Sequence, residues 1–163
     1  MPADPVAELL ELPKEYGSPE VALAWDDVRA RLVGATHYWL ATTRPDGRPH
    51  VVPLDGVWLD DRWYFGGSAK TVKHRNLRAN GRAVLHLEDA EQAVIVEGVC
   101  EQTFPAGELA DRLSERSKSK YGYGPDPASY QKSGVWCLRP ERVLSWHRFP
   151  RDATRFVFRP GST

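Results

Sequence analysis

The stretch Trp63-Tyr-Phe-Gly-Gly-Ser-Ala-Lys-Thr-Val-Lys-His-Arg-Asn-Leu-Arg-Ala-Asn-Gly81 combines a short strand, a glycine break and a basic helix. Its aromatic residues from Trp63 to Phe65 are typical of a strand, and Gly66-Gly67 interrupts it. We expect Ser68 to cap the helix that follows, because its hydroxyl can accept a hydrogen bond from a free N–H of the first turn. We expect Asn80-Gly81 to end that helix, with the glycine in the left-handed conformation.

Basic side chains crowd this predicted helix: Lys70, Lys73, His74, Arg75 and Arg78. The helix dipole is positive at the amino end and usually disfavours cations there. Lysines, a serine and free backbone amides in one place are typical of a site that holds an anion, and phosphate is the natural candidate. The alternative is a surface helix with solvated basic residues, because neither GxxxxGK[ST] nor GxGxxG is present.

The overall composition indicates one soluble domain. The chain has 163 residues, with 22 Lys and Arg against 22 Asp and Glu. Such a length can bury a substantial core, and a balanced charge gives no reason to expect nucleic acid or a membrane surface as a partner. No apolar run reaches the roughly 18 residues of a membrane span. The N-terminus also lacks the layout of a signal peptide, so we expect a cytoplasmic protein.

The two cysteines, Cys100 and Cys137, fall in separate predicted strands. The sequence has no CxxC and no histidine pair at the spacing of zinc ligands. We therefore expect two reduced thiols in or near the core, and no metal site.

Along the chain we expect an N-terminal arm at residues 1–17, loosely ordered, and a single domain at residues 18–163. Ser18-Pro19-Glu20 is a typical helix start, and Gly34 is the expected end. Between them apolar residues recur on one helical face: Val21, Trp25, Val28 and Leu32. A second helix is predicted from Ala106 to about Lys120, with a thin apolar face that covers an edge of the domain. A rigid aromatic loop follows at residues 121–127.

Short strands account for most of the remaining sequence. The predicted strands cover residues 37–43, 49–59, 62–67, 82–88, 92–103, 135–138, 142–149 and 154–158. Pro45-Asp-Gly-Arg48 predicts a hairpin turn, Pro53 and Gly56 indicate a bulge or an exposed edge, and Arg139-Pro140 predicts a further turn. Many short antiparallel strands interrupted by one helix favour a barrel or sandwich over a parallel sheet.

Three segments together resemble the pyridoxamine-phosphate-oxidase-like flavin-binding split barrels. They are the hairpin from Tyr38 to Pro53, the stretch from Phe65 to Val84, and the ending from Leu138 to Trp146 with Thr154 to Phe158. The most specific part is the lysine-x-x-asparagine-leucine helix directly after a strand. The chain length and the Thr-Arg-Phe ending are most similar to the actinobacterial branch that uses the deazaflavin coenzyme F420.

This resemblance implies a mainly β (α+β) fold: a six-stranded antiparallel split β-barrel with flanking helices. It also implies a homodimer with one cofactor at each end of the subunit interface. By position, the cofactor phosphate would lie on Ser68, Lys70, Thr71 and Lys73, with Asn76 supporting the turn. The ring would lie along the second strand, near His50, Val51, Val52 and Pro53. Many relatives have arginine-arginine-lysine where this chain has Thr71-Val72-Lys73, so the expected phosphate site is less basic here. Aspartate-proline is frequent in relatives where this chain has Ala79-Asn80-Gly81.

The resemblance implies an F420-dependent oxidoreductase that transfers a hydride from the reduced deazaflavin to an unsaturated or quinone-like organic substrate. The cofactor would carry that chemistry, and no Ser-His-Asp or Cys-His arrangement is apparent in the sequence. The first alternative is an FMN-dependent oxidase or reductase of the pyridoxamine-phosphate-oxidase type. The second is a non-catalytic carrier of a flavin or haem on the same fold.

Further side chains are candidates for a role at such a site, each with an ordinary structural explanation as the alternative. A general acid could be His50, His147 or Tyr38. An apolar substrate pocket could be walled by Trp58, Trp136 and Trp146. An anionic cofactor tail could be held by Arg29 and Arg31 of the first helix, or by Lys118 and Lys120 of the second.

Overall fold

The computed structural model describes residues 3–160, in which nine strands form one antiparallel sheet and four α-helices flank it. The strands are β1 (Val6–Leu9), β2 (Tyr38–Thr43), β3 (Pro49–Leu54), β4 (Val57–Leu59), β5 (Arg62–Phe65), β6 (Arg82–His86), β7 (Val94–Thr103), β8 (Val135–Ser145) and β9 (Thr154–Val157). The helices are α1 (Trp25–Gly34), α2 (Val72–Ala79), α3 (Gly107–Tyr121) and α4 (Pro127–Ser133), with one 3₁₀ turn at Lys14–Tyr16. The predicted fold class is confirmed.

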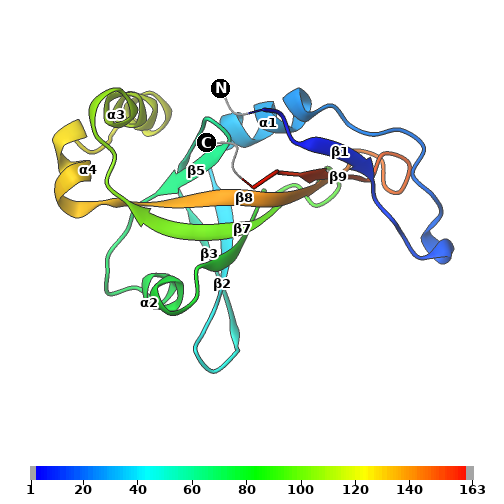
Figure 1. The fold of residues 1–163 in the computed structure, drawn as a ribbon, viewed down its shortest axis with the longest axis horizontal. Helices are drawn as coiled ribbons and strands as arrows, with labels where there is room; N and C mark the ends of the chain where they lie inside the picture. Colours follow the sequence, from blue (N-terminus) through cyan, green and yellow to red (C-terminus); the bar gives the residue numbers. More distant parts are fainter. Residues whose placement is uncertain (1–2, 161–163) are drawn as a thin grey trace.

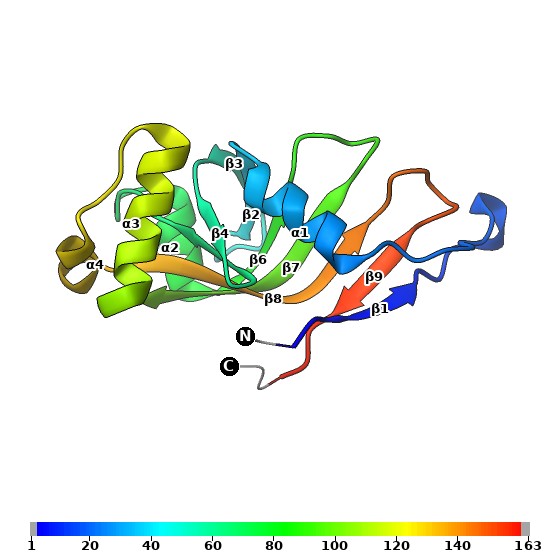
Figure 2. The same ribbon diagram turned by 90° about the horizontal axis from the view of Figure 1, so that it is seen from above.

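The sheet runs in the order β1-β9-β8-β7-β6-β2-β3, and β8 also pairs with β5, which in turn pairs with β4. The two longest strands, β7 and β8, lie side by side through the middle of the molecule (Figure 1). α3 and α4 lie together at one end of this pair, and β1 and β9 lie at the other (Figures 1 and 2). Since β8 pairs with two strands besides β7, it connects both ends of the fold.

Two apolar clusters lie on opposite faces of β8. The larger is the main core, where Leu138 packs with residues of α1, β2 and β6 such as Leu32, Leu40 and Leu85. The smaller contains Cys137 and lies under α3 and α4, whose Leu113 and Tyr130 belong to it. Successive side chains of a strand point to opposite faces, so neighbouring residues of β8 serve different clusters. The second cluster places α3 and α4 beside the site described below.

The first helix is shorter than predicted. The predicted face is correct, since Trp25, Val28 and Leu32 are buried, but Val21 is 53% exposed. The helical start at Ser18-Pro19-Glu20 is wrong. The backbone N–H groups of Glu20 and Val21 donate to the carbonyl of Arg151 instead, so this segment runs alongside the loop before β9.

The N-terminal residues include a strand that the sequence analysis did not predict. All four residues of β1 are exposed, and their backbone pairs with β9, with Val6 opposite Val157 and Leu9 opposite Thr154. Glu8 also accepts hydrogen bonds from Arg155. A strand that buries no side chains has no apolar period to reveal it, so the expectation of a loosely ordered arm is wrong for residues 6–9. The domain boundary after residue 17 remains a prediction.

The long strand predicted over residues 49–59 is two strands, β3 and β4, separated by Asp55-Gly56. At Gly56 the chain crosses the edge of a buried indole, where a Cβ atom would lie 2.2 Å from Nε1 of Trp63. Only glycine permits that approach. β3 pairs with β2 alone within the described residues, which confirms the exposed edge that Pro53 indicated. The hairpin turn between β2 and β3 is also confirmed.

β8 is continuous where a turn was predicted at Arg139-Pro140. The pairing shifts there, because Glu97 lies opposite Arg142 but Gly98 lies opposite Pro140, which leaves Glu141 as the extra residue of a β-bulge. The bulge accommodates a proline inside a long central strand, where it would otherwise remove a ladder hydrogen bond. The predicted turn is therefore wrong, and the local pattern could not show it because the compensating glycine lies on β7.

The second predicted helix is confirmed as α3, but α4 was missed, since only a rigid loop was predicted before residue 127. Both cysteines are free and buried, as predicted, and they lie on opposite faces of the sheet in the two different clusters. Over residues 3–160, no group of histidine, cysteine, aspartate or glutamate side chains is arranged to hold a metal. No helix in that range is long and apolar enough to cross a membrane.

Candidate cofactor-binding site

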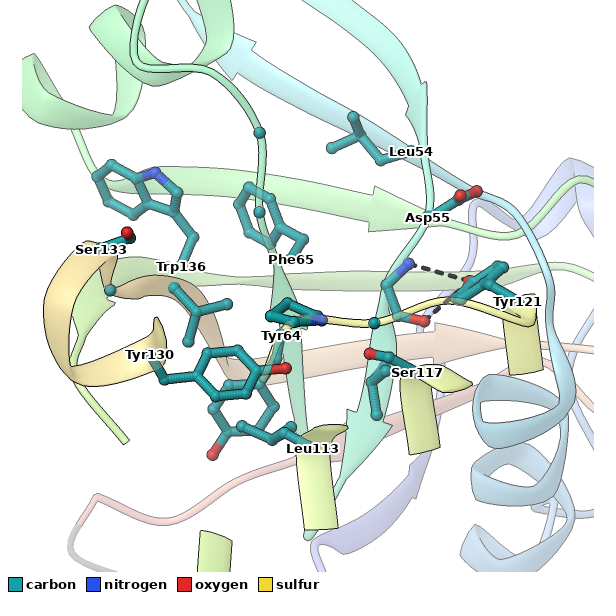
Figure 3. Close-up of a pocket in the computed structure, with 18 of the residues that line it drawn as sticks. Leu54, Asp55, Tyr64, Phe65, Leu113, Ser117, Tyr121, Tyr130, Ser133 and Trp136 are labelled. Carbon is teal, nitrogen blue, oxygen red and sulfur yellow. Dashed lines mark hydrogen bonds between the residues drawn. The ribbon is translucent and has the colours of Figure 1, made fainter. Parts of the chain in front are cut away.

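A cavity of about 820 Å³ opens between the end of β5, the start of α2, the start of β8 and the pair α3–α4. Its walls are mainly aromatic and aliphatic, and Phe65, Trp136, Tyr130 and Leu113 surround it (Figure 3). On the side toward β4, the hydroxyl of Tyr121 accepts a hydrogen bond from the N–H of Gly56 at 3.0 Å and lies 3.0 Å from its carbonyl oxygen (Figure 3). This size and this lining are typical of a site for a small organic ligand.

The loop that leads from β5 into α2 differs from the predicted one. α2 begins at Val72, and Thr71 takes the cap position without a side-chain cap bond. The Ser68 hydroxyl accepts instead from the N–H of Lys70 at 3.2 Å, and the Ser68 carbonyl accepts from the Thr71 hydroxyl at 2.8 Å. Because Ser68 closes a turn within the loop, its predicted role as helix cap is wrong.

The end of α2 also differs from the prediction. Asn80 is the cap residue and is extended, and Gly81 does not take the left-handed conformation. Gly81 is instead a point of close approach, since a Cβ atom there would lie 2.7 Å from the carbonyl oxygen of Cys100. The predicted reason for this glycine is therefore wrong, although the helix does end there.

Lys73 lies at the cavity wall as a buried cation. The residue is only 7% exposed, and within residues 3–160 its Nζ makes one hydrogen-bond contact, a long one of 3.4 Å to the Thr71 hydroxyl. Among the residues that the structure describes, none of the ion pairs includes Lys73. Burial lowers the pKa of Lys73 below its ordinary value. A buried ammonium without a carboxylate is rare unless something else supplies the negative charge.

Gly67 makes room for this ammonium. Its φ is +129°, a conformation that favours glycine, and a Cβ atom there would lie 2.8 Å from Nζ of Lys73. Gly66 and Gly67 both line the cavity. An anion could therefore approach the backbone of these glycines and the ammonium together.

The charges around Lys73 have one sign. The pKa of His50 is lowered, first by burial and then by the positive charges of Arg44 and Lys73. The pKa of His74 is lowered by burial, by Arg78 and by Lys73. Asp55 is the one acidic side chain among the described residues that line the cavity, and its carboxylate is engaged by Tyr123 and His37. The end of the cavity at Lys73 is thus suited to an anionic group.

A comparison with known protein families shows the family to which the chain belongs. The sequence model described as pyridoxamine 5'-phosphate oxidase matches residues 24–147, which is most of the protein. The chain belongs to this family. The matched range contains the whole Tyr38–Pro53 hairpin and the whole Phe65–Val84 stretch, and the resemblance seen in the sequence is confirmed. A comparison with curated proteins found no match.

Solved structures share the fold of this pyridoxamine 5'-phosphate oxidase family member. The conserved hypothetical protein Rv2991 from Mycobacterium tuberculosis is 26% identical, with a TM-score of 0.64 over 78% of this chain and 88% of that one. A protein described as F420 reductase is 24% identical, with a TM-score of 0.51 over 69% and 92% of the two chains. HutZ, described as a haem storage protein from Vibrio cholerae, is 18% identical, with a TM-score of 0.59 over 74% and 92%.

The predicted phosphate residues are only partly brought together. Lys73 lines the cavity. Ser68, Lys70 and Thr71 lie in the loop that precedes α2, and they do not line the cavity. Asn76 is 2% exposed, and its Nδ2 donates to the hydroxyl of Thr42 at 3.0 Å. It fastens α2 to β2, so its predicted role in supporting the turn is wrong.

The four residues predicted to follow the cofactor ring lie on β3, the edge strand. Pro53 lines the cavity, and His50, Val51 and Val52 lie further along the strand, outside the lining. Val51 is 52% exposed. Contact of these residues with a cofactor remains a proposal for this pyridoxamine 5'-phosphate oxidase family member.

The other candidates are mostly structural. Burial raises the pKa of Tyr38, whose hydroxyl donates to the carbonyl of Leu32 at 2.6 Å, so it is not available as a general acid. His147 lies in the loop before β9, where its backbone N–H donates a hydrogen bond to the carboxylate of Asp152. Trp58 is buried beside Asp61 and Trp146 packs against Phe149, so Trp136 alone of the three tryptophans lines the cavity.

The basic residues proposed for a cofactor tail do not line the cavity either. Arg29 pairs with Asp4, Asp26 and Asp61. Arg31 donates to the carbonyl of Gln92, and Lys118 of α3 is exposed. Lys120 turns inward, and its Nζ donates to the hydroxyl of Tyr38 at 2.7 Å and to the carbonyl of Gly56 at 3.1 Å.

The buried ammonium of Lys120 should make the free energy of unfolding depend on pH. Burial lowers its pKa from 10.5 to about 8, so between these pH values the unfolded chain binds more protons than the folded one. The free energy of unfolding should therefore gain a contribution as pH rises from 8 to 10.5. We expect Lys120→Met to remove that contribution, as measured by urea unfolding across this range. Lys118→Met, which also removes one charge from α3, is the control. If the free energy of unfolding changes with pH equally in wild type and in Lys120→Met, the lowered pKa of Lys120 is contradicted.

Sequence reasoning missed two features of the site. One is the aromatic wall from α3 and α4, because Tyr130 lies on α4, which was not predicted, and Tyr121 was placed in the loop after α3. The other is the contact between His74 and Trp136, in which the indole Nε1–H donates to Nδ1 of His74 at 3.1 Å. These residues are 62 positions apart, so no local spacing could have shown the contact.

Proposed function

We propose that this protein is an F420-dependent oxidoreductase that transfers a hydride from the reduced deazaflavin to an unsaturated or quinone-like organic substrate. The observation that carries the proposal is Lys73, a buried ammonium at the wall of a largely aromatic cavity with no carboxylate partner in residues 3–160. The phosphate of a flavin-type cofactor would supply the missing negative charge.

The residues present fit such a group. Lys73 would hold the phosphate beside Gly66 and Gly67, next to the Ser68–Thr71 loop, and Pro53 with Phe65 would flank the ring. When bound, the cofactor supplies the hydride chemistry. The residues of the chain bind it, orient it and exclude water, and the apolar walls of the cavity strengthen every polar contact inside.

Two features favour F420 as the cofactor. The sequence resembles the actinobacterial branch that uses F420, and one structure of the same fold is described as an F420 reductase. The alternative is FMN in an oxidase or reductase of the pyridoxamine-phosphate-oxidase type. Both cofactors carry a phosphate group, so Lys73 serves either.

A haem carrier is the candidate of a different class, because HutZ shares the fold. His74 is one of the histidines that line the cavity, but its Nδ1 accepts a hydrogen bond from Trp136. The proton of the neutral ring is then on Nε2, which leaves no lone pair for a metal. This arrangement favours an organic cofactor over haem ligation by His74.

The proposal includes a homodimer with the cofactor at the subunit interface. The free edge of β3 and the exposed Val51 are the surface that a second copy would cover. Sedimentation velocity tests this part, and a monomer at micromolar concentration would contradict it.

The test of the function is a titration of the purified protein with F420 and, separately, with FMN, followed by quenching of its tryptophan fluorescence. We expect tight binding of F420, weak binding of FMN and oxidation of reduced F420 when a quinone is added. A yellow protein that binds FMN more tightly would indicate the alternative enzyme. Tight binding without turnover would indicate a carrier, and binding of neither cofactor would contradict the proposal.

A further inference from the structure

Four tyrosines line the described walls of the cavity, and the hydroxyls of three are engaged by fixed protein groups. That of Tyr121 bonds to backbone groups, that of Tyr123 donates to a carboxylate, and that of Tyr64 interacts with a thiol. The fourth, Tyr130, is only 5% exposed, and its hydroxyl interacts with the hydroxyl of Ser117. Since a serine hydroxyl can rotate to donate or to accept, Tyr130 is the tyrosine of this set whose O–H can turn to a ligand.

Helices α3 and α4 direct these two hydroxyls to the cavity. Tyr130 is on α4 and packs with Leu113 of α3 and Val135 of β8 in the smaller apolar cluster. Ser117 follows Leu113 by one helical turn, so it lies on the same face of α3. Figure 3 shows the side chains of Tyr130 and Ser117 reaching toward each other at the cavity, and both residues line it. A ligand in the cavity would meet both hydroxyls.

The environment keeps Tyr130 protonated. Burial raises the pKa of Tyr130 above its ordinary value, against a smaller opposing effect of the Ser117 hydroxyl. A tyrosine hydroxyl has one O–H donor and two acceptor positions. When Ser117 donates to the tyrosine oxygen, the phenolic O–H remains for a ligand, and this part of the cavity offers a neutral hydrogen-bond donor.

The position of Tyr130 separates it from the expected phosphate site. Figure 1 shows α2, which carries Lys73, on one side of β7 and β8 and the pair α3–α4 on the other. The described lining residues of α3 and α4 carry no charge. A cofactor held at Lys73 would leave this uncharged wall to the substrate, and a hydroxyl in an apolar wall suits a neutral oxygen such as a carbonyl.

We propose that Tyr130 is the general acid of the reaction, that its O–H donates to the carbonyl oxygen of a conjugated ketone or quinone, and that Ser117 positions it. The inference rests on the proposed function, in which reduced F420 is the hydride donor. It narrows the substrate class to molecules with a carbonyl oxygen in conjugation with the carbon that is reduced.

The step balances in protons and electrons. A C–H bond forms with the hydride, the electron pair of the conjugated system moves to the carbonyl oxygen, and that oxygen takes the proton as the O–H bond of Tyr130 breaks. The substrate is reduced by two electrons, and reduced F420 is oxidised by two. The tyrosine oxygen regains a proton from Ser117, which in turn takes one from water.

Tyr130→Phe removes the hydroxyl and keeps the ring. We expect it to lower kcat for the reduction of menadione by reduced F420 roughly 100-fold, because a positioned general acid contributes about this much or more. Its affinity for F420 should equal that of wild type. Tyr64→Phe is the matched control, since it removes a hydroxyl from the same apolar cluster that Cys137 already engages, and it should retain most of the activity. Thermal unfolding of both variants shows whether the fold is intact.

A second measurement needs neither cofactor nor turnover. Acetylnaphthalene and ethylnaphthalene, substituted at the same ring position, have nearly the same shape, but only the ketone has an oxygen that accepts a hydrogen bond. In equilibrium dialysis with the ligand-free protein, Tyr130→Phe should bind the ketone about fivefold more weakly than wild type does. Its affinity for the hydrocarbon should be unchanged.

Equal losses for the ketone and the hydrocarbon would show that Tyr130 only packs in the wall, and would overturn the inference. If wild type reduces menadione with F420 and Tyr130→Phe does so at the same rate, this inference fails and the proposed function stands. If wild type does not oxidise reduced F420 or reduced FMN with any quinone, the proposed function and the role as general acid both fail, whatever the ketone measurement shows about the hydrogen bond.

Discussion

Replacing Lys73 with methionine is expected to weaken cofactor binding by about 1.5–3 kcal/mol, a factor of roughly 10 to 150. The same change should leave the free energy of unfolding of the ligand-free protein unchanged or raise it. Methionine keeps a long side chain that fills the space beside Gly67 but removes the charge. A group that reduces stability in the free protein and is needed for binding is typical of a functional site.

The expected gain in stability follows from the sign of the pKa shift. Burial lowers the pKa of Lys73 in the folded state, so the folded protein holds this proton less tightly than the unfolded chain does. The charged form is therefore unfavourable in the folded state below the folded pKa. That penalty disappears as pH rises through the ordinary pKa of lysine. Methionine avoids it at all pH values.

Lys70→Met is the matched comparison for this test. Lys70 is exposed in the loop just before α2 and does not line the cavity, so the same loss of charge there should have a smaller effect on affinity. Calorimetric titration and urea unfolding of wild type and both variants measure the two quantities. An affinity for the cofactor that is unchanged in Lys73→Met would contradict the phosphate assignment. So would a large loss of stability, which would show that Lys73 is needed for the fold.

Gly98→Ala is expected to destabilise the protein by about 3 kcal/mol or more. A Cβ atom at this position would lie 2.2 Å from the carbonyl oxygen of Arg139 and 3.1 Å from Cα of Pro140. These are backbone atoms of the neighbouring strand, so no side-chain rotation can relieve the contact. The bulge that lets β8 continue through Pro140 would have to open.

Gly34→Ala is the control for this prediction. Gly34 is the last residue of α1, and a Cβ atom there would meet nothing within 4 Å. Alanine is favoured over glycine in a helix by up to about 1 kcal/mol, so this variant should be neutral or slightly more stable. Thermal and urea unfolding compare the two. A Gly98→Ala protein as stable as wild type would show that the bulge can relax and that its geometry is not required.

The sequence predicted the parts of the fold that local pattern determines. The hairpin at Pro45-Asp-Gly-Arg48, the face of α1 around Val28 and the length of α3 all follow from turn chemistry and periodicity. The predicted helix start at Ser18 is wrong because the backbone N–H of Val21 donates a hydrogen bond to the carbonyl of Arg151, which is far away in the sequence. The predicted turn at Arg139-Pro140 is wrong for a similar reason, since Gly98, which lies opposite Pro140 at the β-bulge, is on another strand.

The site was predictable to the same extent. Lys73 was found by two independent arguments, the helix dipole and the family resemblance, and the structure places it on the cavity. Asn76 was misassigned because its partner, Thr42, lies on β2, 34 positions away. The contact between His74 and Trp136 joins residues that are 62 positions apart. Such a feature appears only when the strands are assembled.

The most direct test of the cofactor site is a crystal structure of the protein with F420, or with FMN if FMN binds more tightly. The phosphate is expected within hydrogen-bond distance of Nζ of Lys73, next to Gly66 and Gly67, with the ring between Pro53 and the wall formed by Trp136. A phosphate bound elsewhere, such as in the groove lined by Arg82, Arg142 and Arg155, with Lys73 in contact with no part of the cofactor, would contradict the account.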